Sequence, residues 1–198
     1  MNKAVFLDKD GTLVEDIPFN ADPGKLRLLP GVAEGLRRLQ QEHYLLIIIT
    51  NQPGIALGRF KESLFREMIG GLYGLLEKEH VHLDGFYYCP HHPEGKGPYA
   101  VHCDCRKPLP GLILQAARSG NIDLAASWMI GDILHDIEAG KRAGCRTILI
   151  DNGNETEWQR SKERTPDHIV DDMPEAAGLI TGKDRFFKID HDAKLEGM

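Results

Sequence analysis

The chain has 198 residues, of which 41% are hydrophobic and 27% are charged. This length and composition suit one α/β domain that buries its own core without disulfide bonds. The net charge of -6 excludes a global basic surface for nucleic acid or an anionic membrane, so a phosphate site would have to be a local cluster of positive groups.

The N-terminal residues, 1–3, run into a strand without the pattern of a signal peptide, and no apolar run approaches the length of a membrane span. We therefore expect a cytoplasmic protein, and we also expect a monomer without nucleic-acid or membrane partners. In the cytoplasm the four cysteines stay reduced, which favours metal binding or burial over disulfide bonds.

The apolar run Ala4 to Leu7 ends at the sequence DKDGT, residues 8–12. Such a run is typical of a buried strand in a parallel sheet, and these sheets bind ligands beyond the carboxyl ends of their strands. We expect Asp8 and Asp10 to lie there. Two carboxylates this close repel each other unless a cation or a proton lies between them, which points to a divalent metal, most simply Mg²⁺.

Two simpler interpretations apply to the same stretch. Asp10-Gly11 could be an ordinary turn that closes the strand, and Asp-x-Asp also opens a calcium-binding loop. The spacing excludes the calcium loop, because the positions that need glycine and a bidentate acid hold Leu13 and Phe19. The turn stays open on these residues alone.

The chain then alternates between irregular, helical and extended patterns. Residues 13–29 are mostly irregular because prolines interrupt any long element, and the segment is too short for a large cap domain. Apolar residues at i, i+4 and i+7 from Val32 predict an amphipathic helix, and the aliphatic run 45–49 predicts a buried strand that ends at Thr50.

The rest of the chain continues this alternation. The predicted helices are 61–80, 112–118, 136–143 and 174–180, and the predicted strands are 86–88, 128–130, 147–150 and a short one at 168–170. Strands and helices that alternate with right-handed crossovers give a doubly wound parallel sheet, so we expect an α/β fold in one domain over residues 1–180. Residues 181–198 form a tail that is either disordered or a late edge element.

Three further polar motifs lie after strands or in loops. They are TNQ at 50–52, RKP at 106–108, and GD at 131–132 followed by Asp136. Each has a simple explanation alone: Thr50 ends a strand, Lys107 could be a solvated surface charge, and Asp132 or Asp136 could cap a helix. Together with DKDGT, and in this order, they resemble the motifs of the haloacid dehalogenase-like (HAD) phosphatases over residues 3–180.

The resemblance implies a covalent mechanism and a HAD-like, capless fold. Asp8 would attack phosphorus and form an aspartyl-phosphate, while Asp10 would protonate the departing sugar oxygen and later activate water. Mg²⁺ would be held by the Asp8 carboxylate, the Asp10 backbone carbonyl and Asp132. Thr50 and Lys107, with backbone N–H groups after Asp8, would hold the phosphoryl oxygens.

The resemblance also implies a supporting residue, Asp136, and a set of substrate contacts. Those contacts would come from Asp16, Ile17, Pro18, Phe19, Asn51, Gln52 and Arg106. Because neighbouring side chains in an extended segment point opposite ways, we expect Lys107 to face Asp8 and Arg106 to face outward along the substrate.

A cluster of metal-binding residue types lies between the second and third motifs. Its members are Cys89, His91, Cys103 and Cys105. They supply the ligands of a closed tetrahedral Zn²⁺ site, although the spacing is not the common Cys-x-x-Cys. His92 and His102 are alternative ligands, and the cysteines could instead be small buried residues. The HAD resemblance selects the first four, with a structural zinc that staples the loop 89–105.

The metal cluster and the motifs together resemble the heptose 1,7-bisphosphate phosphatase branch of the HAD family. That resemblance implies a Mg²⁺-dependent phosphatase acting on a small phosphorylated sugar, D-glycero-D-manno-heptose 1,7-bisphosphate. Two positions depart from the pattern: Pro53 stands where the family usually has Ser, and Ile133 stands where the heptose enzymes often carry Lys.

Three alternatives are kept. A histidinol-phosphate phosphatase of the same branch should present an acid to the substrate amine, and Asp16 and Glu94 are its candidates. An aspartyl-phosphate signalling receiver is disfavoured by Asp10, because an acid/base next to the nucleophile promotes hydrolysis. A zinc-stabilised binding module with a dead active site is disfavoured because every catalytic position is filled.

Overall fold

The computed structural model describes residues 1–159 and 161–183 of the chain. The elements are β1 (Ala4–Leu7), η1 (Pro23–Lys25), α1 (Val32–Gln41), β2 (Leu45–Asn51), α2 (Pro53–Ala56), α3 (Glu62–Lys78), β3 (Gly85–Cys89), η2 (Gly97–Tyr99), α4 (Gly111–Gly120), β4 (Trp128–Gly131), α5 (Leu134–Ala143), β5 (Arg146–Ile150), β6 (His168–Val170) and α6 (Met173–Thr181). Most of the predicted tail lies outside the described residues, and Thr181, which we assigned to it, is the last residue of α6.

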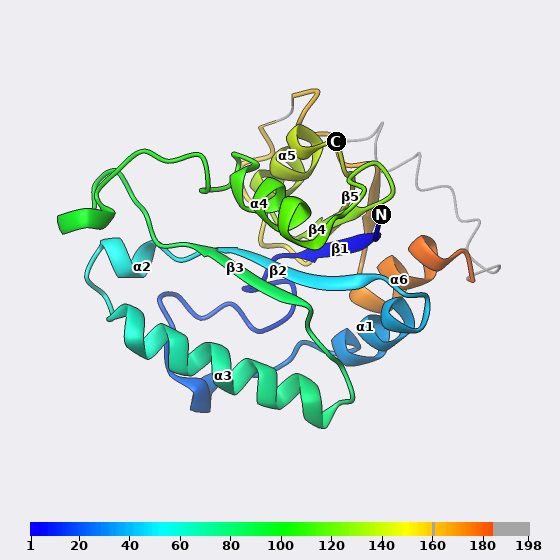
Figure 1. Cartoon of the computed structure of the whole chain (residues 1–198), viewed down its shortest axis with the longest axis horizontal. Helices are drawn as coiled ribbons and strands as arrows, with labels where there is room; N and C mark the ends of the chain where they lie inside the picture. Colours follow the sequence, from blue (N-terminus) through cyan, green and yellow to red (C-terminus); the bar gives the residue numbers. More distant parts are fainter. Residues whose placement is uncertain (160, 184–198) are drawn as a thin grey trace.

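The strands form one six-stranded sheet in the order β3-β2-β1-β4-β5-β6, and each neighbouring pair is parallel. The chain winds outward from β1 to β3 and then returns to β4 on the other side of β1 (Figure 1). This is the predicted doubly wound sheet. Its switch point lies between β1 and β4, where such sheets bind ligands at the carboxyl ends of their strands.

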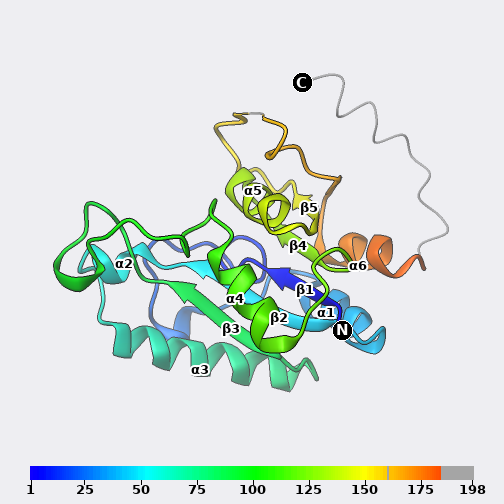
Figure 2. The ribbon, with the colours of Figure 1, turned by 45° about the horizontal axis from the view of Figure 1, so that its top comes forward.

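Helices cover both faces of the sheet (Figure 1, Figure 2): α1, α3 and α6 lie on one face, and α4 and α5 lie on the other. The side chains of β1 alternate between these layers, and all of them are buried. Val5 and Leu7 join the core under α1, α3 and α6, whereas Ala4 and Phe6 join the core under α4 and α5. Because both faces of β1 are covered, its sequence is an unbroken apolar run.

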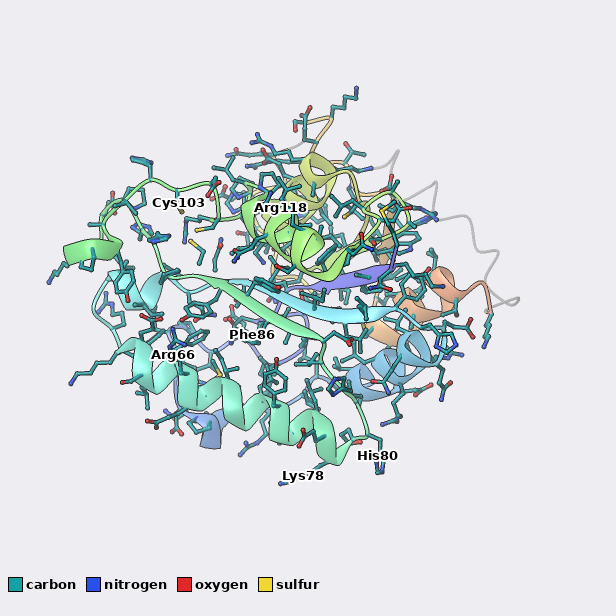
Figure 3. The ribbon with its side chains drawn as sticks, viewed as in Figure 1. Arg66, Lys78, His80, Phe86, Cys103 and Arg118 are labelled. Carbon is teal, nitrogen blue, oxygen red and sulfur yellow. The ribbon has the colours of Figure 1, made fainter. Side chains whose placement is uncertain are left out.

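Aromatic packing holds β3 against α3. Figure 3 shows Phe86 on β3, and its ring centroid lies 6.1 Å from that of Phe65 on α3. The ring of Tyr88, two residues further along β3, lies 4.9 Å from Phe65. Side chains two residues apart on a strand share one face, so these contacts orient the end of β3 from which the cysteine/histidine cluster begins.

Near the site, two element boundaries differ from the predictions and one short helix was not predicted. β2 continues through Thr50 and Asn51 because these residues pair with β3. The short helix α2 was not predicted, since one turn begun by a proline has no periodicity to detect. α5 begins at Leu134 instead of Asp136, because the Asp136 carboxylate accepts a hydrogen bond from the Ile133 N–H at 3.3 Å and so lies inside the first turn.

Within the part of the chain that the structure describes, none of the helices combines the length and the apolar character needed to span a bilayer.

Candidate active site

The segment after β1 is a tight turn that presents two carboxylates. The carbonyl of Lys9 accepts hydrogen bonds from the N–H groups of Leu13 (2.9 Å) and Val14 (3.1 Å). Gly11 has φ +79, and a Cβ there would lie 2.1 Å from Asp132 Oδ2. The turn that we left open as a simple alternative is therefore present, and it brings the first motif against the Gly131-Asp132 motif at the end of β4.

Lys107 lies at the centre of the site. Its side chain is only 3% exposed, and its ammonium group contacts the Asp8 carboxylate, lies 2.6 Å from Asp136 Oδ1 and donates to the Ile49 carbonyl at 3.0 Å. Burial alone would lower the pKa of Lys107, but the Asp136 and Asp8 carboxylates outweigh burial and raise the pKa. The simple explanation of Lys107 as a solvated surface charge is wrong.

Asp136 is fully buried, and its position depends on a glycine. Burial raises the pKa of Asp136 to about 6, against the opposing effect of the Lys107 ammonium. A Cβ at Gly131 would lie 2.2 Å from Asp136 Oδ2, so only glycine fits between β4 and this carboxylate. The Lys107 ammonium thus contacts Asp136 as well as Asp8.

Asp10 is held by two side chains. Gln52 Nε2 donates to Asp10 Oδ2 at 3.0 Å and also lies 3.0 Å from Thr50 Oγ1, which connects the first and second motifs. The ammonium of Lys9, which is 1% exposed, contacts the other oxygen of Asp10. Burial raises the pKa of Asp10, and the Lys9 charge opposes that shift.

Asp132 receives a hydrogen bond on each carboxylate oxygen. Thr12 Oγ1 donates to Oδ1 at 3.0 Å, and Asn154 Nδ2 donates to Oδ2 at 2.7 Å. Burial, together with the negative charges of Asp8 and Asp136, raises the pKa of Asp132 to about 7. A nearby cation would therefore stabilise the ionised form of this carboxylate.

The donor set fits a hard divalent cation. Oxygen atoms of the three buried acids Asp8, Asp132 and Asp136 lie within 4.8 Å of one another. Lys107 is the cation in direct contact with two of them, so negative charge exceeds positive charge around these oxygens. Mg²⁺ takes oxygen ligands and binds through one or two carboxylates, which matches this chemistry.

A cavity of about 240 Å³ opens beside Asp10. Its lining consists of Asp10, Asp16, Ile17, Pro18, Phe19, Asn20, Asn51, Gln52, Pro53 and Gly54. The structure thus brings together six of the seven residues predicted to contact substrate. Arg106 is not part of this lining, and its Nη1 lies 3.4 Å from the carbonyl oxygen of His91.

The four candidate zinc ligands also converge. The Cys105 sulfur lies 3.2 Å from the sulfurs of Cys89 and Cys103 and 3.2 Å from His91 Nδ1, and Cys89 and Cys103 are 3.6 Å apart. A tetrahedron with Zn–S bonds of about 2.3 Å has edges of about 3.8 Å, so the cluster is close to the required size. Figure 3 shows Cys103 in the loop that leads from η2 to α4.

The loop 89–105 has a second attachment. The Glu62 carboxylate, in the first turn of α3, contacts the hydroxyl groups of Tyr88 and of Tyr99 in η2. Hydrogen bonds from Tyr88, Tyr99 and Arg66 lower the pKa of Glu62 to about 2. The η2 part of the loop, which we call its outer arm, is therefore attached to α3 independently of any metal.

Sequence reasoning missed four residues around Asp8, Asp10 and Asp132. Lys9 and Thr12 lie inside the first motif, but that stretch gave no sign of which side chain they would contact. Asn152 and Asn154 lie in the connection between β5 and β6, which has no periodic pattern, and they reach Gly11 and Asp132 across the sheet edge.

Comparisons with known proteins agree with this geometry. A sequence model of the HAD-hydrolase-like family matches residues 104–176. The D-glycero-beta-D-manno-heptose-1,7-bisphosphate 7-phosphatase of Pasteurella multocida is 40% identical over 183 residues, which cover 92% of this chain and 98% of that protein. The protein of the same name from Escherichia coli K12 is 40% identical over 152 residues, which cover 76% of this chain and 80% of that protein.

Two solved structures share the fold at appreciable identity. A HAD-like phosphatase from Mesorhizobium loti has a TM-score of 0.81 at 31% sequence identity. The match covers 91% of this chain and 87% of that protein's chain. A D,D-heptose 1,7-bisphosphate phosphatase from B. bronchiseptica, solved with magnesium and phosphate, has a TM-score of 0.75 at 28% identity and covers 91% of this chain and 98% of its own.

Proposed function

The chain belongs to the HAD-like phosphatases, and on that premise we propose that it removes the 7-phosphate of D-glycero-β-D-manno-heptose 1,7-bisphosphate. The names of relatives that are about 40% identical over most of the chain support this substrate. The observation that carries the chemistry is the buried Lys107 ammonium between the carboxylates of Asp8 and Asp136. A solvated surface lysine has no such environment.

Asp8 is the proposed nucleophile. Its carboxylate oxygen attacks phosphorus, the bond to the sugar oxygen breaks, and an aspartyl-phosphate forms that water later hydrolyses. The Lys107 ammonium, held in place by Asp136, offsets negative charge on the carboxylate and on the transferred phosphoryl group. One preorganised donor of this kind is worth about 10²- to 10³-fold in rate.

Asp10 is the proposed general acid and base. It protonates the departing sugar oxygen in the first step and takes a proton from water in the second. The contacts with Gln52 and Lys9 restrict its carboxylate, and its raised pKa favours a protonated fraction for the first step. The cavity of about 240 Å³ begins at Asp10, so a sugar bound there has its leaving oxygen beside the acid.

The Asp8 and Asp132 carboxylates, with the Asp10 backbone carbonyl, would hold Mg²⁺, which supplies positive charge against the nucleophile and the phosphoryl oxygens. The excess of buried carboxylate over ammonium at this position supports the assignment. Neighbouring side chains orient these proposed ligands: Thr12 and Asn154 donate hydrogen bonds to Asp132, and Lys107 contacts Asp8.

The Cys89, His91, Cys103 and Cys105 cluster would hold a structural Zn²⁺. It has no position left for water, and it ends one residue before Arg106. Its expected effect is to set where Arg106 and Lys107 begin. Reduced cysteines at such a site suit a cytoplasmic enzyme, which is the location that we propose.

A histidinol-phosphate phosphatase is the second candidate, and the position of Asp16 keeps it open. Asp16 lines the cavity and could face a substrate amine, whereas Glu94 is not part of the lining. An acid in this position also accepts hydrogen bonds from sugar hydroxyl groups, so Asp16 is compatible with both substrates.

The test compares rates on the β and α anomers of the heptose bisphosphate and on histidinol phosphate. We expect the highest kcat/KM on the β anomer, with phosphorus NMR showing loss of the 7-phosphate signal. A higher kcat/KM on histidinol phosphate would replace the proposed substrate. Loss of the 1-phosphate would reverse the orientation of the sugar in the cavity.

A further inference from the structure

The connection after β5 makes three polar contacts with the segments that follow β1 and β4. Asn152 Nδ2 donates to the Gly11 carbonyl at 2.6 Å, Asn154 Nδ2 donates to Asp132 Oδ2 at 2.7 Å, and the Glu155 carboxylate accepts from the Leu134 N–H at 2.7 Å. We call residues 152–155 the clasp. It contacts the first motif, the residue after β4 and the start of α5.

The clasp has its own internal order. Asn152 Oδ1 accepts from the Asn154 N–H at 3.2 Å, and Gly153 between them has φ +86, a conformation that favours glycine. This turn directs the two asparagine side chains toward neighbouring parts of the site. A Cβ at Gly11 would lie 2.5 Å from Asn154 Nδ2, so the amide is packed directly against the catalytic turn.

Among the residues that the clasp contacts, Asp132 is a buried acid whose charge is repelled by neighbouring carboxylates. It is 4% exposed and lies near the carboxylates of Asp8 and Asp136. Thr12 and Asn154 each donate to one of its oxygens, and each oxygen keeps a further lone pair for a cation. Hydrogen bonds to the ionised form favour that form and fix its orientation.

We propose that Asn154 is a positioning residue that holds Asp132 in the orientation required for Mg²⁺, so that the clasp sets the affinity of the divalent-cation site. This inference rests on the proposed role of Asp132 in metal binding. Carboxylates that bind metals are oriented by hydrogen-bonding partners, and loss of such a partner typically weakens metal affinity about 10- to 100-fold.

The choice of cation separates positioning from general damage. Mg²⁺ demands near-ideal octahedral geometry, whereas Ca²⁺ accepts more ligands in flexible arrangements. A freed Asp132 carboxylate should therefore weaken Mg²⁺ binding more than Ca²⁺ binding. A loop that merely became disordered would weaken both cations by the same factor.

The experiment is calorimetric titration of Mg²⁺ and of Ca²⁺ into protein dialysed free of both ions without a chelator, so that any metal at the cysteine/histidine cluster stays bound. The variants are Asn154→Ala, Asp132→Asn and, as a matched control, Asn2→Ala. Asn154 is an exposed residue, so its substitution removes no core packing. Asn2 loses one amide hydrogen bond, to the Gly120 carbonyl, at the opposite edge of the sheet.

We expect Asn154→Ala to raise the Kd for Mg²⁺ about 10- to 100-fold and the Kd for Ca²⁺ by a smaller factor, with Asn2→Ala unchanged. An unchanged Kd for Mg²⁺ in Asn154→Ala, or equal losses for the two cations, would overturn the positioning role. Retention of full Mg²⁺ affinity by Asp132→Asn would instead show that the metal assignment in the proposed function is wrong.

Discussion

The side chain of Asn51 holds both polar groups of the Lys107 backbone: its Oδ1 accepts from the Lys107 N–H at 3.0 Å, and its Nδ2 donates to the Lys107 carbonyl at 3.0 Å. Asn51 lies at the end of β2, which is paired with β3 and packed in the sheet. Lys107 is thus attached to a strand of the sheet, although it belongs to the loop after the cysteine/histidine cluster. Asn51 was predicted to contact substrate, but both polar atoms of its amide are hydrogen-bonded to the Lys107 backbone.

The first prediction concerns Asn51→Ala. It leaves two backbone groups of a buried residue without their partner, which we expect to lower the free energy of unfolding by about 1 to 3 kcal/mol. A shift of the Lys107 ammonium by about 1 Å should lower kcat about 10²-fold. Asn51→Asp, which keeps the acceptor and loses the donor, should fall between. Equal kcat for parent and Asn51→Ala would show that Lys107 needs no such support.

The second prediction concerns Asp8 and Asp10, the two aspartates that we propose to be catalytic. Asp8→Asn is isosteric and removes the proposed nucleophile, so we expect a folded protein without turnover. Asp10→Asn should lose about 10²- to 10⁴-fold in kcat, the usual contribution of a general acid and base. Because its second step is also slow, intact-protein mass spectrometry of Asp10→Asn with substrate should detect a phosphate adduct. An Asp8→Asn variant that still releases phosphate would exclude the covalent route.

Much of the site could be predicted from sequence because the sheet is parallel. The carboxyl ends of β1, β2 and β4 meet at one edge, so motifs that follow those strands must be neighbours. This rule predicted where Asp8 and Asp10 would lie, whereas the roles of Asp8, Asp10 and Asp132 came from the HAD resemblance. The residue types of the cysteine/histidine cluster indicated a metal site, and the HAD resemblance selected Cys89, His91, Cys103 and Cys105 from the alternatives.

The remaining contacts depend on turns that carry no periodic signal. In an extended strand, the side chains of Lys9 and Asp10 would point to opposite faces. The chain turns after Asp8 instead, and the Lys9 ammonium contacts the Asp10 carboxylate. Asn154 reaches Asp132 from a connection whose course is set by its own short-range hydrogen bonds. Neither contact follows from strand or helix spacing, so only coordinates reveal them.

The third prediction is a pH dependence of Mg²⁺ binding. The pKa of Asp132 is about 7 in the fold against an ordinary value of 3.8. Because the pKa is higher in the folded state, the folded protein binds the proton more tightly than the unfolded chain does. The stability that Asp132 contributes is therefore fully present below about pH 3.8 and is lost as the pH rises through about 7. The metal-free protein should therefore lose stability over that interval, while Mg²⁺ binding, which needs the ionised form, should tighten.

Thermal melts with and without Mg²⁺ at about pH 5 and about pH 8 measure this effect. We expect the rise in Tm caused by Mg²⁺ to be small at the lower pH and larger at the higher pH. Asp132→Asn should remove the difference. An equal Mg²⁺-induced rise in the parent at both values would contradict the raised pKa or the assignment of the ligand.

The fourth prediction concerns the cysteine/histidine cluster. Protein purified without added metal should contain about one Zn²⁺ per chain by elemental analysis, and its removal should lower Tm because metal-binding energy is folding energy here. Cys105→Ser should lower the zinc content. Cys145→Ser is the matched control, because Cys145 is a buried core cysteine outside the cluster.

The loop should open only partly when the metal is removed, since Glu62 still contacts Tyr99 at its outer arm. Hydrogen exchange should therefore increase most near the four ligands and least around η2. Purified protein that contains neither zinc nor iron would refute the metal site.

The last prediction separates Arg106 from Lys107. The Lys107 ammonium contacts the Asp8 carboxylate, whereas one guanidinium nitrogen of Arg106 lies 3.4 Å from the His91 carbonyl oxygen. A guanidinium has five N–H donors in a fork that matches a phosphate, so this one long contact leaves donors for a second phosphate group. The cavity lining contains the acids Asp10 and Asp16 and no basic residue, so a bisphosphate needs a cation beyond it.

Lys107→Ala should lower kcat on every substrate, because the ammonium contacts Asp8, the proposed nucleophile. Arg106→Ala should weaken binding of the bisphosphate by about 1.5 to 3 kcal/mol, the value of a charged hydrogen bond, and scarcely affect a small monophosphate. Arg106→Lys should recover only part of the loss, because it keeps the charge without the fork. Arg118→Ala on the exposed face of α4 controls for net charge. Equal losses by Arg106→Ala on mono- and bisphosphates would reject the selective role of Arg106 and would weaken the bisphosphate as the proposed substrate.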